Sequence, residues 1–151
     1  MKSTLLLAVI ILSVIVSGCN STKTTETKKS ASNASIYDSV WELEYITGPR
    51  ITFEGLYPED KPTITFNETE KTFGGNNSCN VYNGKFTKKE NTIEFGDTIK
   101  TMRFCEGGGE ETFMNMLGKV NKFAIDNEGK LLLQMNDITM MRFKNVTKNK
   151  Q

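Results

Sequence analysis

Histidine is absent from this 151-residue chain, tryptophan occurs once, and there are only three prolines and three cysteines. Because histidine is the commonest general base and metal ligand, its absence removes the usual basis of acid–base catalysis and of metal binding. The cysteines form no Cys-x-x-Cys motif and are too few for a structural zinc site. We therefore expect a protein that is not an enzyme, with no catalytic residue, metal or cofactor.

The chain also lacks a large excess of charge of one sign. Its formal net charge is +1, and the segment 36–145 carries 17 acidic and 13 basic side chains, a net charge of −4. Nucleic-acid-binding domains are usually recognised by a basic surface. We therefore expect no nucleic-acid partner.

The first eighteen residues differ from the rest. Lys2 is the only charge before Cys19, and residues 5–16 are apolar except for Ser13. A short positive region followed by an apolar run of about a dozen residues is typical of a secretory signal peptide, and it is too short for a comfortable transmembrane helix. Residues 1–18 are therefore predicted to be a signal peptide.

The end of this run resembles the lipobox of bacterial lipoproteins, since it reads Val16-Ser17-Gly18-Cys19. The resemblance implies that Cys19 is the lipidation site, carrying diacylglycerol and an acyl chain such as palmitate. Stable anchoring needs two or more acyl chains. The alternative is an ordinary cleaved signal with an unrelated cysteine. We expect a lipid-anchored protein of the bacterial cell envelope, in the outer membrane because Asn20 is not the aspartate associated with inner-membrane retention.

Residues 19–35 are predicted to form the lipidated cysteine and a flexible stalk. Residues 20–35 contain no apolar side chain larger than alanine, so they cannot bury enough surface to offset the entropy of ordering. Their net charge of +2 leaves open a second contact with anionic lipid, although a solvated spacer is the simpler interpretation. The folded domain is predicted at 36–145 and a polar tail at 146–151.

Alternation of apolar and polar residues dominates the predicted domain. In residues 40–47, Trp41, Leu43 and Tyr45 share one face of a half-buried strand, and Trp41 is expected to be buried in the core. Further strands are predicted at 63–66, 70–73, 80–87, 92–95, 98–105, 122–125, 130–134 and 138–144. The pattern predicts a mainly β fold, a small antiparallel β-barrel of about eight strands.

One segment follows a helical period instead. Phe113, Leu117 and Val120 are spaced for one face of a helix over residues 110–120, with Glu110 and Glu111 in its first turn. The sequence predicts one short amphipathic helix on an open side or end of the sheet.

Several short motifs occur along the chain, and their order and spacing resemble those of the META domain (HslJ-like) family. They are Trp41-x-Leu43, Gly74-Gly75, Cys79-Asn80-x-Tyr82-x-Gly84, Thr101 with Cys105, Glu110-x-x-Phe113-x-x-x-Leu117, and Leu131-x-Leu133. Two positions depart from the family pattern: Ser78 replaces the usual glycine, and Met102 lies one place early. The resemblance implies a lipocalin-like barrel with one helix, in envelope proteins linked to stress and antibiotic tolerance without an established biochemical activity.

Cys79 and Cys105 are the only cysteines in the predicted domain. An isolated pair in an oxidising compartment favours a disulfide over free thiols, and the resemblance places a pair here. Closing this loop would contribute roughly 3 kcal/mol. The nearby Gly74-Gly75-Asn76-Asn77-Ser78 segment favours a bend or bulge in a strand over an anion-binding loop.

Two function classes remain open. The first is an interaction or stress-tolerance module that binds an unknown envelope protein or component. The alternative is a binder of a small apolar or amphipathic ligand inside the barrel, and interior volume distinguishes the two. We prefer the first, because the chain has enough large side chains to fill a small barrel: Trp41, Phe53, Phe66, Phe86, Phe95, Phe104, Phe123 and Phe143.

Overall fold

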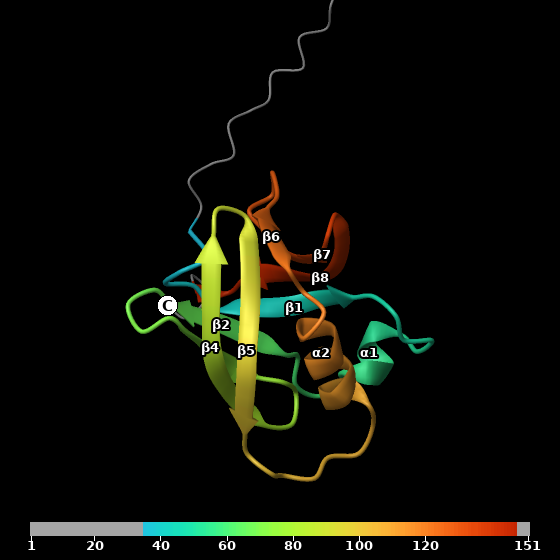
Figure 1. Cartoon of the computed structure of the whole chain (residues 1–151). Coiled ribbons are helices and arrows are strands. Elements are labelled where there is room, and N and C mark those ends of the chain that lie inside the picture. Colours follow the sequence, from blue (N-terminus) through green and yellow to red (C-terminus); the bar gives the residue numbers. More distant parts are fainter. Residues whose placement is uncertain (1–34, 148–151) are drawn as a thin grey trace, which may run out of the picture.

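The computed structural model describes residues 35–147, which form one closed ring of antiparallel strands with two short helices (Figure 1). The strands are β1 (Trp41–Ile46), β2 (Thr63–Asn67), β3 (Thr72–Asn76), β4 (Val81–Lys89), β5 (Thr92–Lys100), β6 (Lys122–Ile125), β7 (Leu131–Met135) and β8 (Ile138–Asn145). Each strand pairs with the next, and β8 returns to pair with β1. The predicted mainly β, eight-stranded antiparallel fold is confirmed.

Two helices accompany the ring, α1 (Phe53–Leu56) and α2 (Gly109–Leu117). The second is the predicted helix, although it starts one residue earlier and ends before Val120. The first was not predicted, because four residues are too few for a helical period. Residues 1–34 and 148–151, which include the predicted signal peptide, Cys19, most of the stalk and most of the tail, lie outside the described residues.

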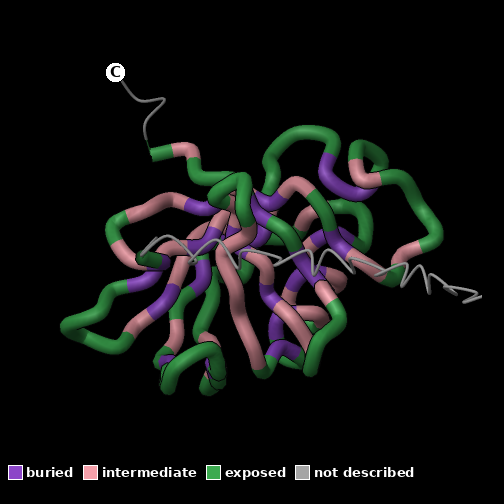
Figure 2. Tube along the Cα trace, turned by 90° about the horizontal axis from the view of Figure 1, so that it is seen from above, coloured by how far each residue is buried: buried purple, intermediate pink, exposed green. Residues whose placement is uncertain are grey.

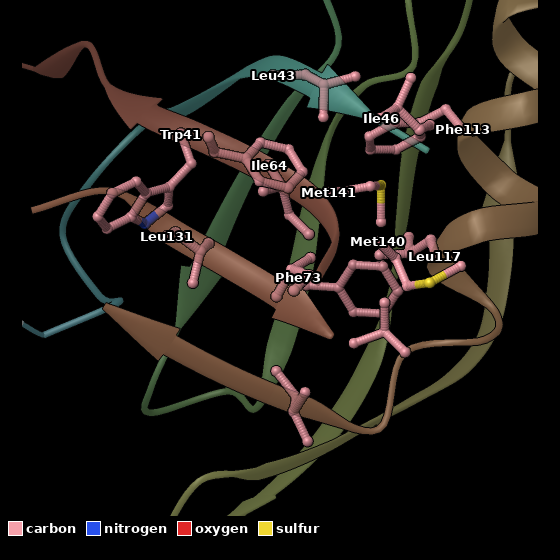
Figure 3. Packing of buried hydrophobic residues seen from close by; sticks show 14 of the residues in the cluster. Trp41, Leu43, Ile46, Ile64, Phe73, Phe113, Leu117, Leu131, Met140 and Met141 are labelled. Carbon is pink, nitrogen blue, oxygen red and sulfur yellow. The ribbon is translucent and has the colours of Figure 1, made fainter. Parts of the chain in front are cut away.

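The ring encloses a core of packed side chains (Figure 3), and Figure 2 shows the buried segments gathered inside the exposed loops. Aromatic rings contact one another across it, with centroids 4.7 Å apart for Phe73 and Phe95 and 5.6 Å apart for Tyr82 and Phe113. Phe113 comes from α2, so this helix contributes its apolar face to the core at one end of the ring. Phe104, expected among the filling residues, lies outside and is 88% exposed.

The prediction for β1 is correct for two of its three apolar residues. Trp41 and Leu43 are buried, but Tyr45 is 43% exposed and Ile46 takes the inward position. The pairing of β1 with β8 shifts by one residue between Leu43 and Tyr45, which is a β-bulge at Glu44. A bulge inverts the alternation of faces beyond it, so a strict period of two gives the wrong face for Tyr45.

The two strands predicted at 92–95 and 98–105 are one strand, β5, which ends at Lys100. Gly96 and Asp97 interrupt the alternation because they form a β-bulge. Together they lie opposite a single residue of β4, Lys85, where the register of the β4–β5 pairing shifts. A glycine–aspartate pair suits either a turn or a bulge, and the structure contains the bulge. Residues 101–108 leave the sheet and lead to α2.

The bend expected in the segment 74–78 begins at Ser78, beyond the end of β3, and not at the Gly74-Gly75 pair. Both residues lie within β3 and pair with Asn83 and Tyr82 of β4 without a register shift. A Cβ atom on Gly75 would lie 2.1 Å from the carbonyl oxygen of Thr63, so only glycine permits the close approach of β2 and β3.

Candidate functional site

The irregular segments 77–80 and 101–108 meet where β4 begins, β5 ends and α2 begins, and we call this region the disulfide corner. Cys79 and Cys105 are joined by a disulfide, with their Cα atoms 5.9 Å apart. The pairing is the one that the family resemblance implies. Cys105 lies in the loop beyond β5 and not at the end of a strand as predicted, so the disulfide connects two loops.

A buried asparagine holds the same two loops together. The Asn80 Oδ1 atom accepts hydrogen bonds from Thr101 Oγ1 and from the Arg103 backbone N–H, both at 2.7 Å. Its Nδ2 atom donates to the Arg103 carbonyl and to Glu110 Oε2, both at 2.9 Å. The amide is therefore fully satisfied although it is buried. Sequence reasoning placed Asn80 in a motif but gave it no role.

A second buried asparagine shapes the turn that leads into Cys79. Asn77 Oδ1 accepts hydrogen bonds from the backbone N–H of Cys79 at 3.3 Å and of Asn80 at 2.7 Å, which forms an Asx turn. Its Nδ2 atom has no hydrogen-bond partner among the described residues. Ser78 has a φ of 84°, in the left-handed region that favours glycine, which gives a reason for the family's glycine at this position.

Glu110 connects the corner to α2. It lies in the first turn of the helix, where a carboxylate suits the helix dipole, and it forms an ion pair with Lys100 of β5. Burial would raise the pKa of Glu110, but the hydrogen bonds from Lys100 and Asn80, together with the nearby Lys100 charge, hold it below its ordinary value of 4.5. The carboxylate is therefore ionised and helps to fix the start of α2.

Because the pKa of Glu110 is lower in the folded chain than in the unfolded chain, its stabilising contribution is complete above pH 4.5. The contribution is lost as the pH falls through the folded-state pKa. We expect Glu110→Gln to cost about 1–2 kcal/mol at pH 7 through loss of a charge-assisted hydrogen bond. In acid the wild type should lose stability more steeply than the variant, measured by urea unfolding between pH 7 and pH 3.

A matched control is Glu128→Gln, because Glu128 is a well-exposed partner of an ion pair with Lys130. Surface pairs of this kind contribute little, so the control should follow the wild-type acid profile closely. Parallel acid profiles for wild type and Glu110→Gln would contradict the assignment.

A surface cleft of about 860 Å³ opens beside the disulfide. One wall comes from the end of α1 and the residues after it, and the other comes from the corner and the first turns of α2. Five carboxylates line the cleft, with only two cationic side chains: Glu59, Asp60, Glu106, Glu110 and Glu111 against Lys100 and Arg103. The cleft therefore presents mainly negative charge.

The two walls are fixed to each other. The Tyr57 hydroxyl donates to the Gly109 carbonyl at 3.1 Å, and burial raises the pKa of Tyr57 far enough to keep it a neutral donor. A Cβ atom on Gly109 would lie 2.6 Å from the Leu56 carbonyl oxygen, so the chain segments that carry α1 and α2 are in close contact. The Thr52 side chain caps α1 by accepting from Gly55 N–H.

The described part of the chain contains no group of three or more histidine, cysteine, aspartate or glutamate side chains placed to hold a metal ion. Among the same residues, no helix has the length and apolar character needed to cross a membrane.

The META domain model matches residues 34–147. The chain is also similar to two solved structures. One is the NMR structure of a protein from Burkholderia xenovorans, with a TM-score of 0.59 and 20% identity, covering 74% of this chain and 84% of that one. The other is an NMR structure of a protein, with a TM-score of 0.49 and 19% identity, covering 70% of this chain and 87% of that one. No curated protein matches.

The first of these structures shares the fold, and the family model spans the whole ring together with the disulfide corner. The chain belongs to the META domain family.

Proposed function

We propose that this protein is a non-enzymatic, lipid-anchored module of the bacterial cell envelope that acts by binding another envelope component through its surface. The packed interior carries the proposal. Buried side chains from the strands and from α2 form one cluster inside the ring, in which Phe73, Leu131, Leu133 and Met141 are almost fully buried. A core filled in this way leaves recognition to the outer surface.

The same packing argues against the alternative, a small apolar ligand inside the barrel. Ligand-binding barrels enclose a cavity, whereas here aromatic rings contact one another across the interior. The cleft beside the disulfide lies outside the ring, and its lining includes five carboxylates and two cationic side chains. A module that binds its partner through its outer surface therefore agrees better with the packed interior than a carrier of a small apolar ligand does.

Two features support an envelope location. The disulfide is of the kind that persists in oxidising compartments such as the periplasm. The Val16-Ser17-Gly18-Cys19 segment supports lipidation at Cys19, and the absence of aspartate at Asn20 favours the outer membrane. In Figure 1 the blue start of the described chain lies toward the end of the ring that carries the β4–β5 hairpin, and the loop from β5 to α2 lies at the opposite end, so the corner is far from the point where the stalk would join the domain.

Lipidation can be tested by mass spectrometry of the protein from its native host. We expect the N-terminal peptide to begin at Cys19 and to carry a diacylglyceryl group, because two or more acyl chains are needed for stable anchoring. Membrane fractionation should then recover the protein with the outer membrane. Cys19→Ala should release it from the membrane while leaving its thermal midpoint unchanged.

The matched control is Cys79→Ala/Cys105→Ala, which removes the other two cysteines and should remain membrane-bound. An unmodified N-terminus at another residue would contradict the proposal of a lipid anchor.

A further inference from the structure

We propose that the cleft at the disulfide corner binds a cationic, amphipathic segment of a partner protein, with lysine or arginine side chains in the acidic cleft and apolar side chains on the adjoining loop. The inference rests on the proposed interaction role and names its partner chemistry. It is argued from the charge of the cleft, the exposed apolar side chains beside it, and the rigidity of both.

The charge of the cleft is not neutralised within the domain. Of its five carboxylates, only Glu110 forms an ion pair in the part of the chain that the structure describes. Glu59 and Asp60 lie on one wall, and Glu106 and Glu111 lie on the other, all exposed. A cationic segment between these walls would pair with carboxylates from both sides, and such complementarity selects the partner and speeds association.

Large apolar side chains adjoin the acidic cleft. Phe104 lines its edge and is 88% exposed, and Met102 on the same loop is 91% exposed. Val81 and Ile99 are exposed at the neighbouring ends of β4 and β5. Aromatic residues and methionine are enriched in protein interfaces, and contiguous exposed apolar residues mark interaction sites.

The loop that presents Met102 and Phe104 is held in place on both sides of Phe104. Asn80 binds the backbone of Arg103, and the disulfide fixes Cys105. A loop that is already ordered loses little conformational entropy on binding, so its apolar side chains can contribute more to affinity. The disulfide thus has a second consequence besides stability, since it preorganises the surface.

The shape of the cleft favours a protein segment over a small molecule. Small-molecule sites bury about 70–90% of their ligand, whereas this cleft is open at the surface. Anionic lipid is also disfavoured, because the carboxylates around Phe104 would be repelled by a negative membrane surface. A chain segment can leave its outer side exposed and still use both the acidic walls and the apolar loop.

The test uses the mature protein purified from its host. If the protein is lipidated, it is reconstituted into nanodiscs of zwitterionic lipid, and if it is not lipidated, it is studied in solution. The probe is a short fluorescent peptide of lysine and leucine at helical spacing, titrated by anisotropy. Asp60→Asn/Glu111→Gln should weaken binding about tenfold at low salt, and Phe104→Ala about thirtyfold. The matched control is Ile138→Ala, which removes another exposed apolar side chain, 60% exposed and outside the cleft, and should bind as the wild type does.

Three results would overturn the proposal. The first is absence of binding, and the second is equal binding of a peptide in which every lysine is replaced by glutamate. The third is binding that the cleft variants do not alter. Equal binding of the peptide to empty nanodiscs, or self-association of the protein that covers the cleft, would count as this third result. Lipidation of Cys19 is measured separately by mass spectrometry. A cleft that does not bind the peptide and a protein that carries no lipid anchor therefore give different results.

Discussion

Trp41→Ala is expected to lower the free energy of unfolding by about 3–5 kcal/mol, the usual cost of removing a large aromatic side chain from a core. Trp41 begins β1 and is only 2% exposed. Figure 3 shows its ring among the core side chains, with Leu131 close by. Its loss would leave a cavity that the closed ring of strands cannot easily collapse to fill.

Trp41 also fixes the chain that enters the barrel. Its indole N–H donates to the Ile36 carbonyl at 2.9 Å, and Ile36 is itself buried. Trp41→Phe should keep most of the packing but leave this carbonyl without its partner, at a cost of about 1–3 kcal/mol. The graded loss from phenylalanine to alanine separates the hydrogen bond from the cavity.

The measurement is urea unfolding monitored by circular dichroism, because the variants lack the only tryptophan. In the wild type, that tryptophan should emit at short wavelength when folded and shift to the red on unfolding. Tyr45→Ala is the matched control on the same strand, expected to cost less than about 1 kcal/mol because Tyr45 is 43% exposed and points away from the core. Solvent-like emission from folded protein would contradict the buried position of Trp41.

Removal of the disulfide is expected to cost about 3.5 kcal/mol, because the two cysteines are 26 residues apart in the sequence and their bond restricts the unfolded chain. Cys79→Ala/Cys105→Ala should therefore show a much lower midpoint in urea. Reductant should lower the melting temperature of the wild type and leave that of the double variant unchanged. Non-reducing peptide mapping should find the two cysteine peptides linked.

The loss of stability without the disulfide should be greatest at the disulfide corner. Without the disulfide, the loop from β5 to α2 keeps its hydrogen bonds to Asn80 but loses its fixed point at Cys105. Hydrogen exchange should accelerate in residues 101–108 before it accelerates in the strands of the ring. Free alkylation of both thiols in protein purified from the envelope would contradict the disulfide.

Regular elements were predictable because their periodicity reports directly on burial. The apolar positions of β1 up to Leu43 and those of α2 match the core, since each needs only an uninterrupted period of two or of 3.6 residues. Two errors in strand assignment fall at bulges, at Glu44 and at Gly96-Asp97, whereas β3 runs through Gly74-Gly75 without a bulge. A bulge depends on how a strand fits its neighbour, and local sequence does not specify that neighbour.

The candidate site was predictable only in part. The cysteine pair follows from composition, compartment and family resemblance. In contrast, the hydrogen bonds of Asn80 join residues more than twenty positions apart. Glu59 and Asp60 face α2 across the cleft only because α1 packs beside α2. Asparagine and surface carboxylates are common in loops, so their types alone indicate no site.

By itself, the sequence determined a mainly β ring of about eight strands, a short amphipathic helix, a cysteine pair and membership of a family, because each depends on residue types at fixed spacing. Only the tertiary structure decided the exposure of Tyr45 and Phe104, the close approach at Gly75 and the acidic cleft beside the disulfide. These features depend on which distant segments meet. That is set by the closure of the whole ring and the packing of its core, and not by any local pattern.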